Sequence, residues 1–140
     1  MNLLALTARL DRLEQTQNSV PGVKPAGAAG VTATAHAGGA FARGAYIEIA
    51  AASSITSKYR PTAVILDNLS AGDEFEVDLA VGGAGSETVV ATIRVCEHGR
   101  KILTSCPYVD ANARLAARIG CRDAVARTAG ISVEFIDSLS

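Results

Sequence analysis

From residue 45 onward, apolar and polar residues alternate along most of the chain, and this period of two is the feature that most limits the fold. In EFEVDLAV (74–81), for example, the apolar side chains fall on one face of an extended strand and three acids fall on the other. Turn-forming stretches separate such segments: SAGD (70–73), GGAGS (82–86) and EHGR (97–100). Many short strands at this spacing predict a mainly β fold, an antiparallel β-sandwich or jelly roll.

Two segments allow a more detailed prediction. If His98 and Gly99 form a two-residue turn, Val95 faces Ile102 in a hairpin and Glu97 pairs with Arg100. Residues 110–130 are ambiguous, because their alanines and arginines favour a helix whereas the surrounding alternation favours a strand. We expect a strand over 113–119.

The first residues carry a helical pattern instead. Residues 1–17 predict a short N-terminal helix, in which Leu3, Leu6, Leu10 and Leu13 occupy heptad core positions and Arg9 and Glu14 have the spacing of an interchain salt bridge. Two heptads are too short to be stable alone. We therefore expect the helix to pack on a sister chain, on its own domain or on a different protein.

Residues 18–44 are rich in glycine, alanine and proline and predict a flexible or extended arm that joins the helix to a β-sandwich domain over 45–140. The arm is either a loose tether or a segment that becomes ordered on a neighbour. In the second case VTATA (31–35) would add a strand to a sheet edge through Val31, Ala33 and Ala35.

Composition and motifs exclude several classes of function. The net charge of −1 argues against a dedicated nucleic-acid or membrane binder, and 4% aromatic residues are few for a sugar-binding surface. Three cysteines without CxxC spacing do not form a disulfide framework and predict a chain that folds in a reducing cytoplasm. His36 and His98 would both have to move to form a dyad, and GGAGSET (82–88) is more typical of a hairpin connection than of a phosphate loop. We therefore expect no catalytic residues, no cofactor and no metal.

Charges are unevenly distributed along the chain. Residues 67–87 hold six acids and no base, whereas residues 1–60 hold six bases and three acids. This separation either serves complementarity with a neighbouring subunit or reflects ordinary scatter over the surface.

Two stretches carry a family pattern that covers residues 44–119: GAYIEIAAASSITSKYRPTAVILDNLSAGDEFEVDLAVGGAGSETVVATIRV (44–95) and PYVDANARLAARIG (107–120). Together they resemble a family of small virion proteins of tailed phages, to which the capsid cement (decoration) protein of a Bordetella phage belongs. The resemblance implies a jelly-roll fold, with ANARLAAR as a strand, and a non-enzymatic protein on the outer surface of the phage head.

The partners that the resemblance implies are the major capsid protein and a second copy of the chain, as a homodimer or alternatively a trimer. The chain would be made in the host bacterial cytoplasm and reside on the exterior of the capsid. Two alternatives are a tail-associated or receptor-binding jelly-roll module and an enzyme on a sandwich scaffold.

Overall fold

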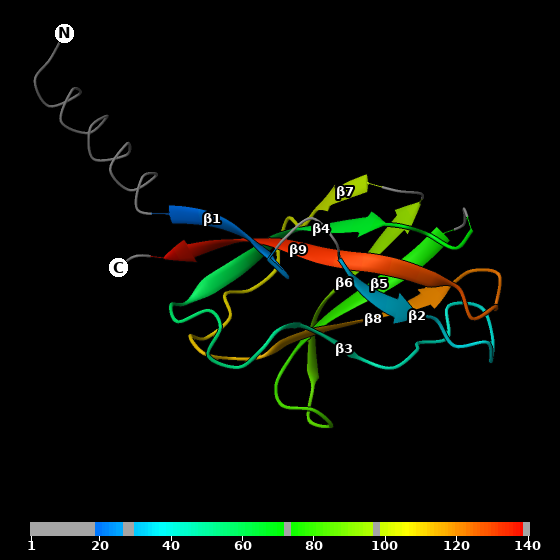
Figure 1. The fold of residues 1–140 in the computed structure, drawn as a ribbon, viewed down its shortest axis with the longest axis horizontal. Helices are drawn as coiled ribbons and strands as arrows, with labels where there is room; N and C mark the ends of the chain where they lie inside the picture. The colour runs from blue at the N-terminus through cyan, green and yellow to red at the C-terminus, as the bar shows by residue number, and fades with distance from the viewer. Residues whose placement is uncertain (1–18, 27–29, 72–73, 97–98, 139–140) are drawn as a thin grey trace, which may run out of the picture.

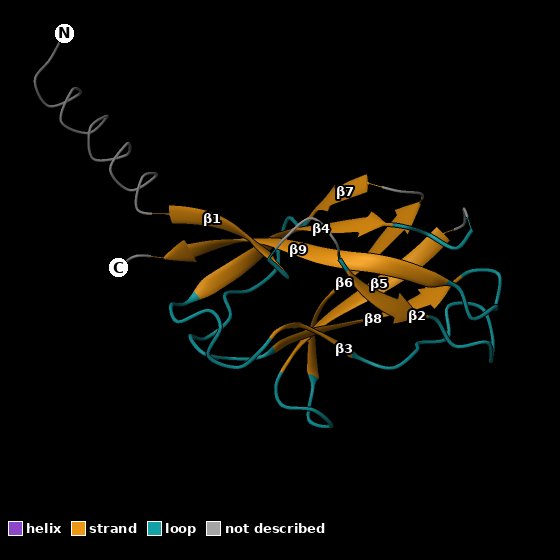
Figure 2. Cartoon of the chain, viewed as in Figure 1, coloured by secondary structure: helices purple, strands orange, loops and turns teal. Residues whose placement is uncertain are grey.

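The protein is described by a computed structural model that covers residues 19–138, except 27–29, 72–73 and 97–98. The described part contains nine strands and no helix, and its strands form two antiparallel sheets packed as a β-sandwich (Figure 2). The strands are β1 (Ser19–Lys24), β2 (Val31–Thr34), β3 (Ile47–Ala50), β4 (Tyr59–Asp67), β5 (Glu74–Val81), β6 (Thr88–Cys96), β7 (Gly99–Ile102), β8 (Leu115–Cys121) and β9 (Thr128–Ser138). The predicted helix over 1–17 lies outside the described residues.

The chain passes repeatedly between the two sheets (Figure 1). One sheet, here called sheet A, has the order β1-β9-β4-β7, with β2 also paired to β9, and the other, sheet B, has the order β3-β8-β5-β6. The long strand β9 organises sheet A, because β4 pairs along one side of it while β1 and β2 share the other side. β6 and β7 are the edge strands at one side of the sandwich.

The arm prediction needs correction for its strand-forming parts. Residues 19–24 and 31–34 do not reach toward a neighbour but pair with β9 of the same chain, at Gly22 to Phe135 and at Ala33 to Ala129. The glycine at position 22 permits this approach, because a Cβ there would overlap the Phe135 ring. The sequence indicated an available strand at VTATA, but composition could not tell whose sheet edge it joins.

The predicted hairpin between the segments before and after His98 is wrong. β6 pairs with β5 in sheet B, whereas β7 pairs with β4 in sheet A, so Val95 lies opposite Phe75 and Ile102 lies opposite Ala63. A turn motif specifies a reversal of the chain, but it does not specify whether the next strand stays in the same sheet. Strand β4 pairs with β9 along one side only, and β7 pairs along its other side instead of pairing with β6.

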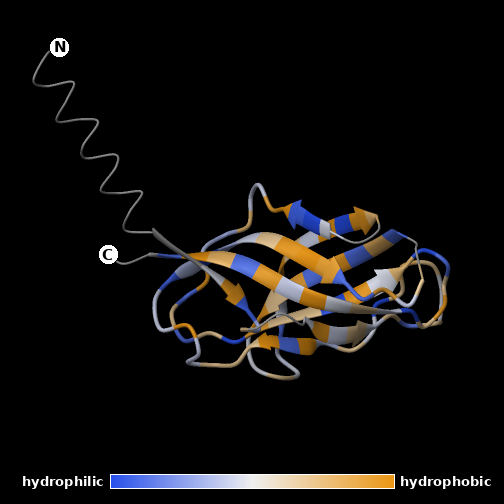
Figure 3. Cartoon of the chain, turned by 45° about the horizontal axis from the view of Figure 1, so that its top comes forward, coloured by the Kyte–Doolittle hydropathy of each residue, from blue (hydrophilic) through white to orange (hydrophobic). Residues whose placement is uncertain are grey.

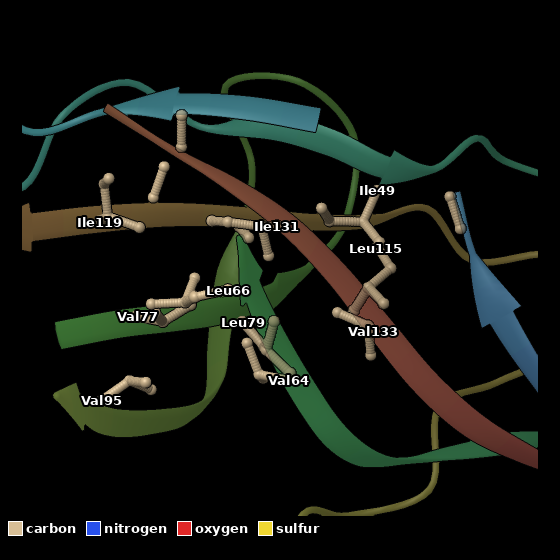
Figure 4. Packing of buried hydrophobic residues seen from close by; sticks show 14 of the residues in the cluster. Ile49, Val64, Leu66, Val77, Leu79, Val95, Leu115, Ile119, Ile131 and Val133 are labelled. Carbon is tan, nitrogen blue, oxygen red and sulfur yellow. The ribbon is translucent and has the colours of Figure 1, made fainter. Parts of the chain in front are cut away.

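The core lies between the two sheets, and Figure 4 shows Val64 of sheet A beside Leu79 of sheet B and Val133 of sheet A beside Leu115 of sheet B. Strand β5 has the predicted bounds, and Phe75, Val77 and Leu79 are fully buried. The alternation of hydropathy along the strands is visible in Figure 3. Residues 115–121 form a strand, which confirms the strand prediction within 110–130 apart from a shift of two residues.

Candidate interaction surfaces

The outer face of sheet B carries a network of ion pairs centred on the three acids of β5. Glu74, Glu76 and Asp78 are each within salt-bridge distance of arginines, which come from the strands beside β5, from the turn after β8 or from the segment before β3. In the sequence, the acid-rich stretch 67–87 fitted either complementarity with a neighbouring subunit or ordinary scatter of charge over the surface. The structure shows instead that these three acids are neutralised within the chain.

Asp78 is the centre of this network. Its side chain is 5% exposed, and its Oδ2 accepts hydrogen bonds from Arg43 Nε at 2.9 Å and Arg118 Nε at 2.8 Å. Its Oδ1 accepts a hydrogen bond from Thr92 Oγ1 at 2.7 Å. Burial opposes ionisation of Asp78, but the hydrogen bonds from Arg43, Thr92 and Arg118 outweigh it and lower the pKa of this carboxyl.

The segment before β3 closes this face. The Phe41 amide donates to the carbonyl of Cys121 at 2.8 Å and the Gly44 amide to the carbonyl of Ile119 at 2.9 Å, so residues 41–44 extend along the edge of β8. The guanidinium of Arg94 makes a cation–π contact with the Phe41 ring, with its Cζ 4.6 Å from the ring centroid. Gly120 leaves the space for this segment, because a Cβ there would overlap the Phe41 carbonyl.

A second cluster fastens the hairpin between β5 and β6. Arg114 Nη1 lies 3.1 Å from Glu87 Oε1, and Arg114 Nε lies 3.0 Å from Glu48 Oε1. Arg114 Nη1 also donates to the carbonyl of Gly82 at 3.2 Å. The stretch GGAGSET is therefore the hairpin connection that the sequence predicted, with Val81 opposite Thr88 at its base.

A groove of about 680 Å³ separates the edge strands β6 and β7. It is lined by Val90–Ile93 and by residues 100–106, including the buried Cys106. No disulfide joins the three cysteines, of which Cys96 is exposed and Cys106 and Cys121 are buried. His36 lies away from this groove's lining residues and accepts a hydrogen bond from the Gly38 amide at 2.8 Å, whereas His98 is outside the described residues.

The described residues contain no group of three or more His, Cys, Asp or Glu side chains arranged to hold a metal ion. Within the same residues there is no helix long and apolar enough to cross a membrane.

A further surface was not singled out by sequence analysis. Tyr59 and Val109 form an antiparallel bridge at the start of β4, and both side chains are buried. Lys58, Arg60 and Tyr108 flank the bridge, and the two cations lie over the ring of Tyr108, which is 54% exposed. We call these three residues the basic corner. The alternation in KYR (58–60) was the available signal, but it is too short to interpret alone.

The residues predicted for an interface fall into two groups. Leu3, Leu6, Arg9, Leu10, Leu13 and Glu14 lie outside the described residues. Ala33 and Ala35 are buried in the chain's own core, and Val31 packs against it. Ala33 and Ala35 are therefore not available to a neighbour, whereas Val31 is partly exposed at the start of β2.

No family model matches the chain, and a comparison with curated proteins found no match. One similar solved structure is a chain of the Bacillus endospore appendages, described as a novel family of disulfide-linked pili, with a TM-score of 0.46 and 18% identity over 88% of this chain and 90% of the other. A second is a chain of infectious bursal disease virus, Gx strain, with a TM-score of 0.35 and 11% identity over 87% of this chain. The present chain covers only 33% of that viral chain.

Proposed function

We propose that the protein is a non-enzymatic component of a tailed-phage particle that binds the outer surface of the head and cements neighbouring major capsid subunits. The sequence resemblance over 44–119 supports this proposal. The strand order is also compatible with it, because β2-β9-β4-β7 and β3-β8-β5-β6 correspond to the two sheets of a jelly roll, with β1 added at one edge.

The observation that carries the proposal is the ion-pair network on the outer face of sheet B. It joins β6, β5, β8 and the segment 41–44, so that strands far apart in sequence are held laterally as one body. A cement protein has to resist outward pressure on the shell while it bridges subunits through many weak contacts. A sandwich tied across its strands suits that mechanical task.

Bridging also requires attachment at more than one point. We propose that two copies associate as a homodimer, which places identical capsid-binding surfaces on both sides of a twofold axis. The leucines of the predicted N-terminal helix are the proposed anchor. Replacing Leu6 and Leu10 by Asp should leave the sandwich folded, as judged by circular dichroism, but should lower the oligomer mass or the affinity for the shell. An unchanged oligomer mass together with an unchanged affinity for the shell would show that the predicted helix is not the anchor.

The direct test mixes the purified protein with phage heads that lack it. We expect saturable co-sedimentation at a fixed ratio to the major capsid protein, and decorated heads that survive a higher temperature than bare heads. Absence of binding at micromolar protein and moderate salt would contradict the proposal. Labelled protein found on tails instead of heads would support a tail-associated module.

A further inference from the structure

The arginines of the described chain are almost all paired with acids of the same chain, whereas its lysines, Lys24, Lys58 and Lys101, join no ion pair among the described residues. Seven of the eight described arginines form an ion pair with a carboxylate, and Arg60 is the one that does not. Lys58, two residues earlier, also joins no ion pair in this part of the chain. Both belong to the basic corner.

Backbone pairing fixes the direction of these side chains. The Tyr59 amide donates to the Val109 carbonyl at 3.0 Å, and the Val109 amide donates to the Tyr59 carbonyl at 2.6 Å. Tyr59 and Val109 point into the core, at 0% and 3% exposure. Because successive side chains of extended segments point to opposite sides, the residues that flank this bridge face solvent.

The cations are held against an aromatic ring rather than against an acid. Lys58 Nζ lies 5.8 Å from the centroid of the Tyr108 ring and Arg60 Cζ lies 5.4 Å from it, both within the range of a cation–π contact. The nearest acid in sequence, Asp110, is exposed and joins no ion pair among the described residues. The two cations therefore keep hydrogen-bond donors that no carboxylate in the described chain uses.

Tyrosine and arginine are the residue types that most often dominate the energy of a protein interface, and here they are ordered before binding. We propose that the basic corner, formed by Lys58, Arg60 and Tyr108, docks on an acidic protein surface that supplies carboxylates to the two cations and covers the tyrosine ring. This inference rests on the proposed function, in which that surface belongs to the phage head.

A second copy of the chain is a poorer partner for the same corner. In a twofold pair built on this surface, Lys58 and Arg60 would face their own equivalents, and like charges in contact are unfavourable. The acids of β5 are already paired with arginines of their own chain, and Asp110, the exposed acid two residues after Tyr108, offers a single carboxylate for the two cations. The corner therefore fits a different protein.

The test measures binding to heads that lack this protein, at several salt concentrations. A Lys58→Gln/Arg60→Gln double variant should bind about 10- to 100-fold more weakly than the unmodified chain and should show a shallower salt dependence. Tyr108→Ala should weaken binding about 10-fold. Lys101→Gln is the matched control, since Lys101 is an exposed lysine of β7 that joins no ion pair among the described residues, and it should stay within about twofold.

The outcomes separate this inference from the proposed function. If the unmodified chain binds heads and the double variant binds equally well, the corner is not the docking surface but the proposed function stands. If the unmodified chain does not bind heads, both fail. Retention of the unmodified chain, but not the double variant, on duplex DNA at the same salt would assign the corner to nucleic acid. A lower oligomer mass of the double variant would assign it to self-association.

Discussion

The outer face of sheet B and the basic corner use the same kinds of residue in opposite ways. On sheet B, Arg43 and Arg118 both pair with the nearly buried Asp78, so these charges are neutralised within the chain. At the corner, Arg60 lies over an exposed tyrosine and pairs with no carboxylate of the described residues. Position in the fold, and not residue type, decides whether a charge stabilises the sandwich or remains available to a partner.

This contrast also changes the meaning of the acid-rich stretch between residues 67 and 87. Its acids suggest a negative surface when they are read in sequence order, but folding brings arginines of β6 and β8 alongside β5. The side chains that remain outside ion pairs at the corner carry the opposite sign. A search for the partner should therefore look for an acidic surface.

The largest effect on stability should follow from removing the central carboxylate of sheet B. Asp78→Asn leaves two arginines without their shared anion and should lower the free energy of unfolding by about 3 kcal/mol. Urea denaturation measures this change. Asp110→Asn is the control, because this exposed acid joins no ion pair within the described chain, and it should change stability by less than about 0.5 kcal/mol. Equal effects of the two variants would remove the contrast between the regions.

The carboxyl of Asp78 should also make the free energy of unfolding depend on pH. The folded-state pKa of Asp78 is lowered below its unfolded value, so its contribution is complete above about pH 4 and is lost as the pH falls through the folded-state pKa. The difference in unfolding free energy between the unmodified chain and Asp78→Asn should accordingly shrink below about pH 4. A difference that stays constant down to pH 2 would show that Asp78 is not held ionised by Arg43, Thr92 and Arg118.

A substitution at Gly120 tests how closely residues 41–44 pack against β8. Gly120→Ala would drive a methyl group into the Phe41 carbonyl and against Arg43, and should cost about 2 kcal/mol. Gly83→Ala is the control, because nothing lies within 4 Å of the added Cβ. Thermal unfolding of both variants, at one protein concentration, would settle whether this segment is tightly bound to β8.

The smallest effect is expected at the basic corner. Arg60→Gln removes an exposed cation that no carboxylate of the described chain pairs with, so the free energy of unfolding should change by less than about 0.5 kcal/mol. Urea denaturation beside Asp78→Asn makes the comparison direct. A loss above about 1 kcal/mol would mean that the corner holds the sandwich together rather than serving recognition.

The sequence predicted the strands better than their partners. Alternation located β5 with its correct bounds, because a strand buried on one face imposes a period of two on its own residues. Pairing depends on residues distant in the chain, and for that reason the hairpin across His98 failed while β7 joined β4. Glycine and proline in residues 19–24 likewise concealed β1, whereas β2 was indicated as a strand but its partner β9 was not.

The candidate surfaces were less predictable still. The separation of charges was visible in the sequence, but the contacts that neutralise Glu74, Glu76 and Asp78 come from residues up to 48 positions away. The basic corner depends on the bridge between Tyr59 and Val109, which no local pattern specifies. Neither ion-pair partners nor exposed clusters can be assigned before the strands are placed.

The most direct test of the account is an image reconstruction of the intact particle that shows where this protein resides. The account predicts pairs of sandwich-shaped densities on the outside of the head, each pair in contact with at least two major capsid subunits. Density confined to the tail, or a pair that touches a single capsid subunit, would contradict it.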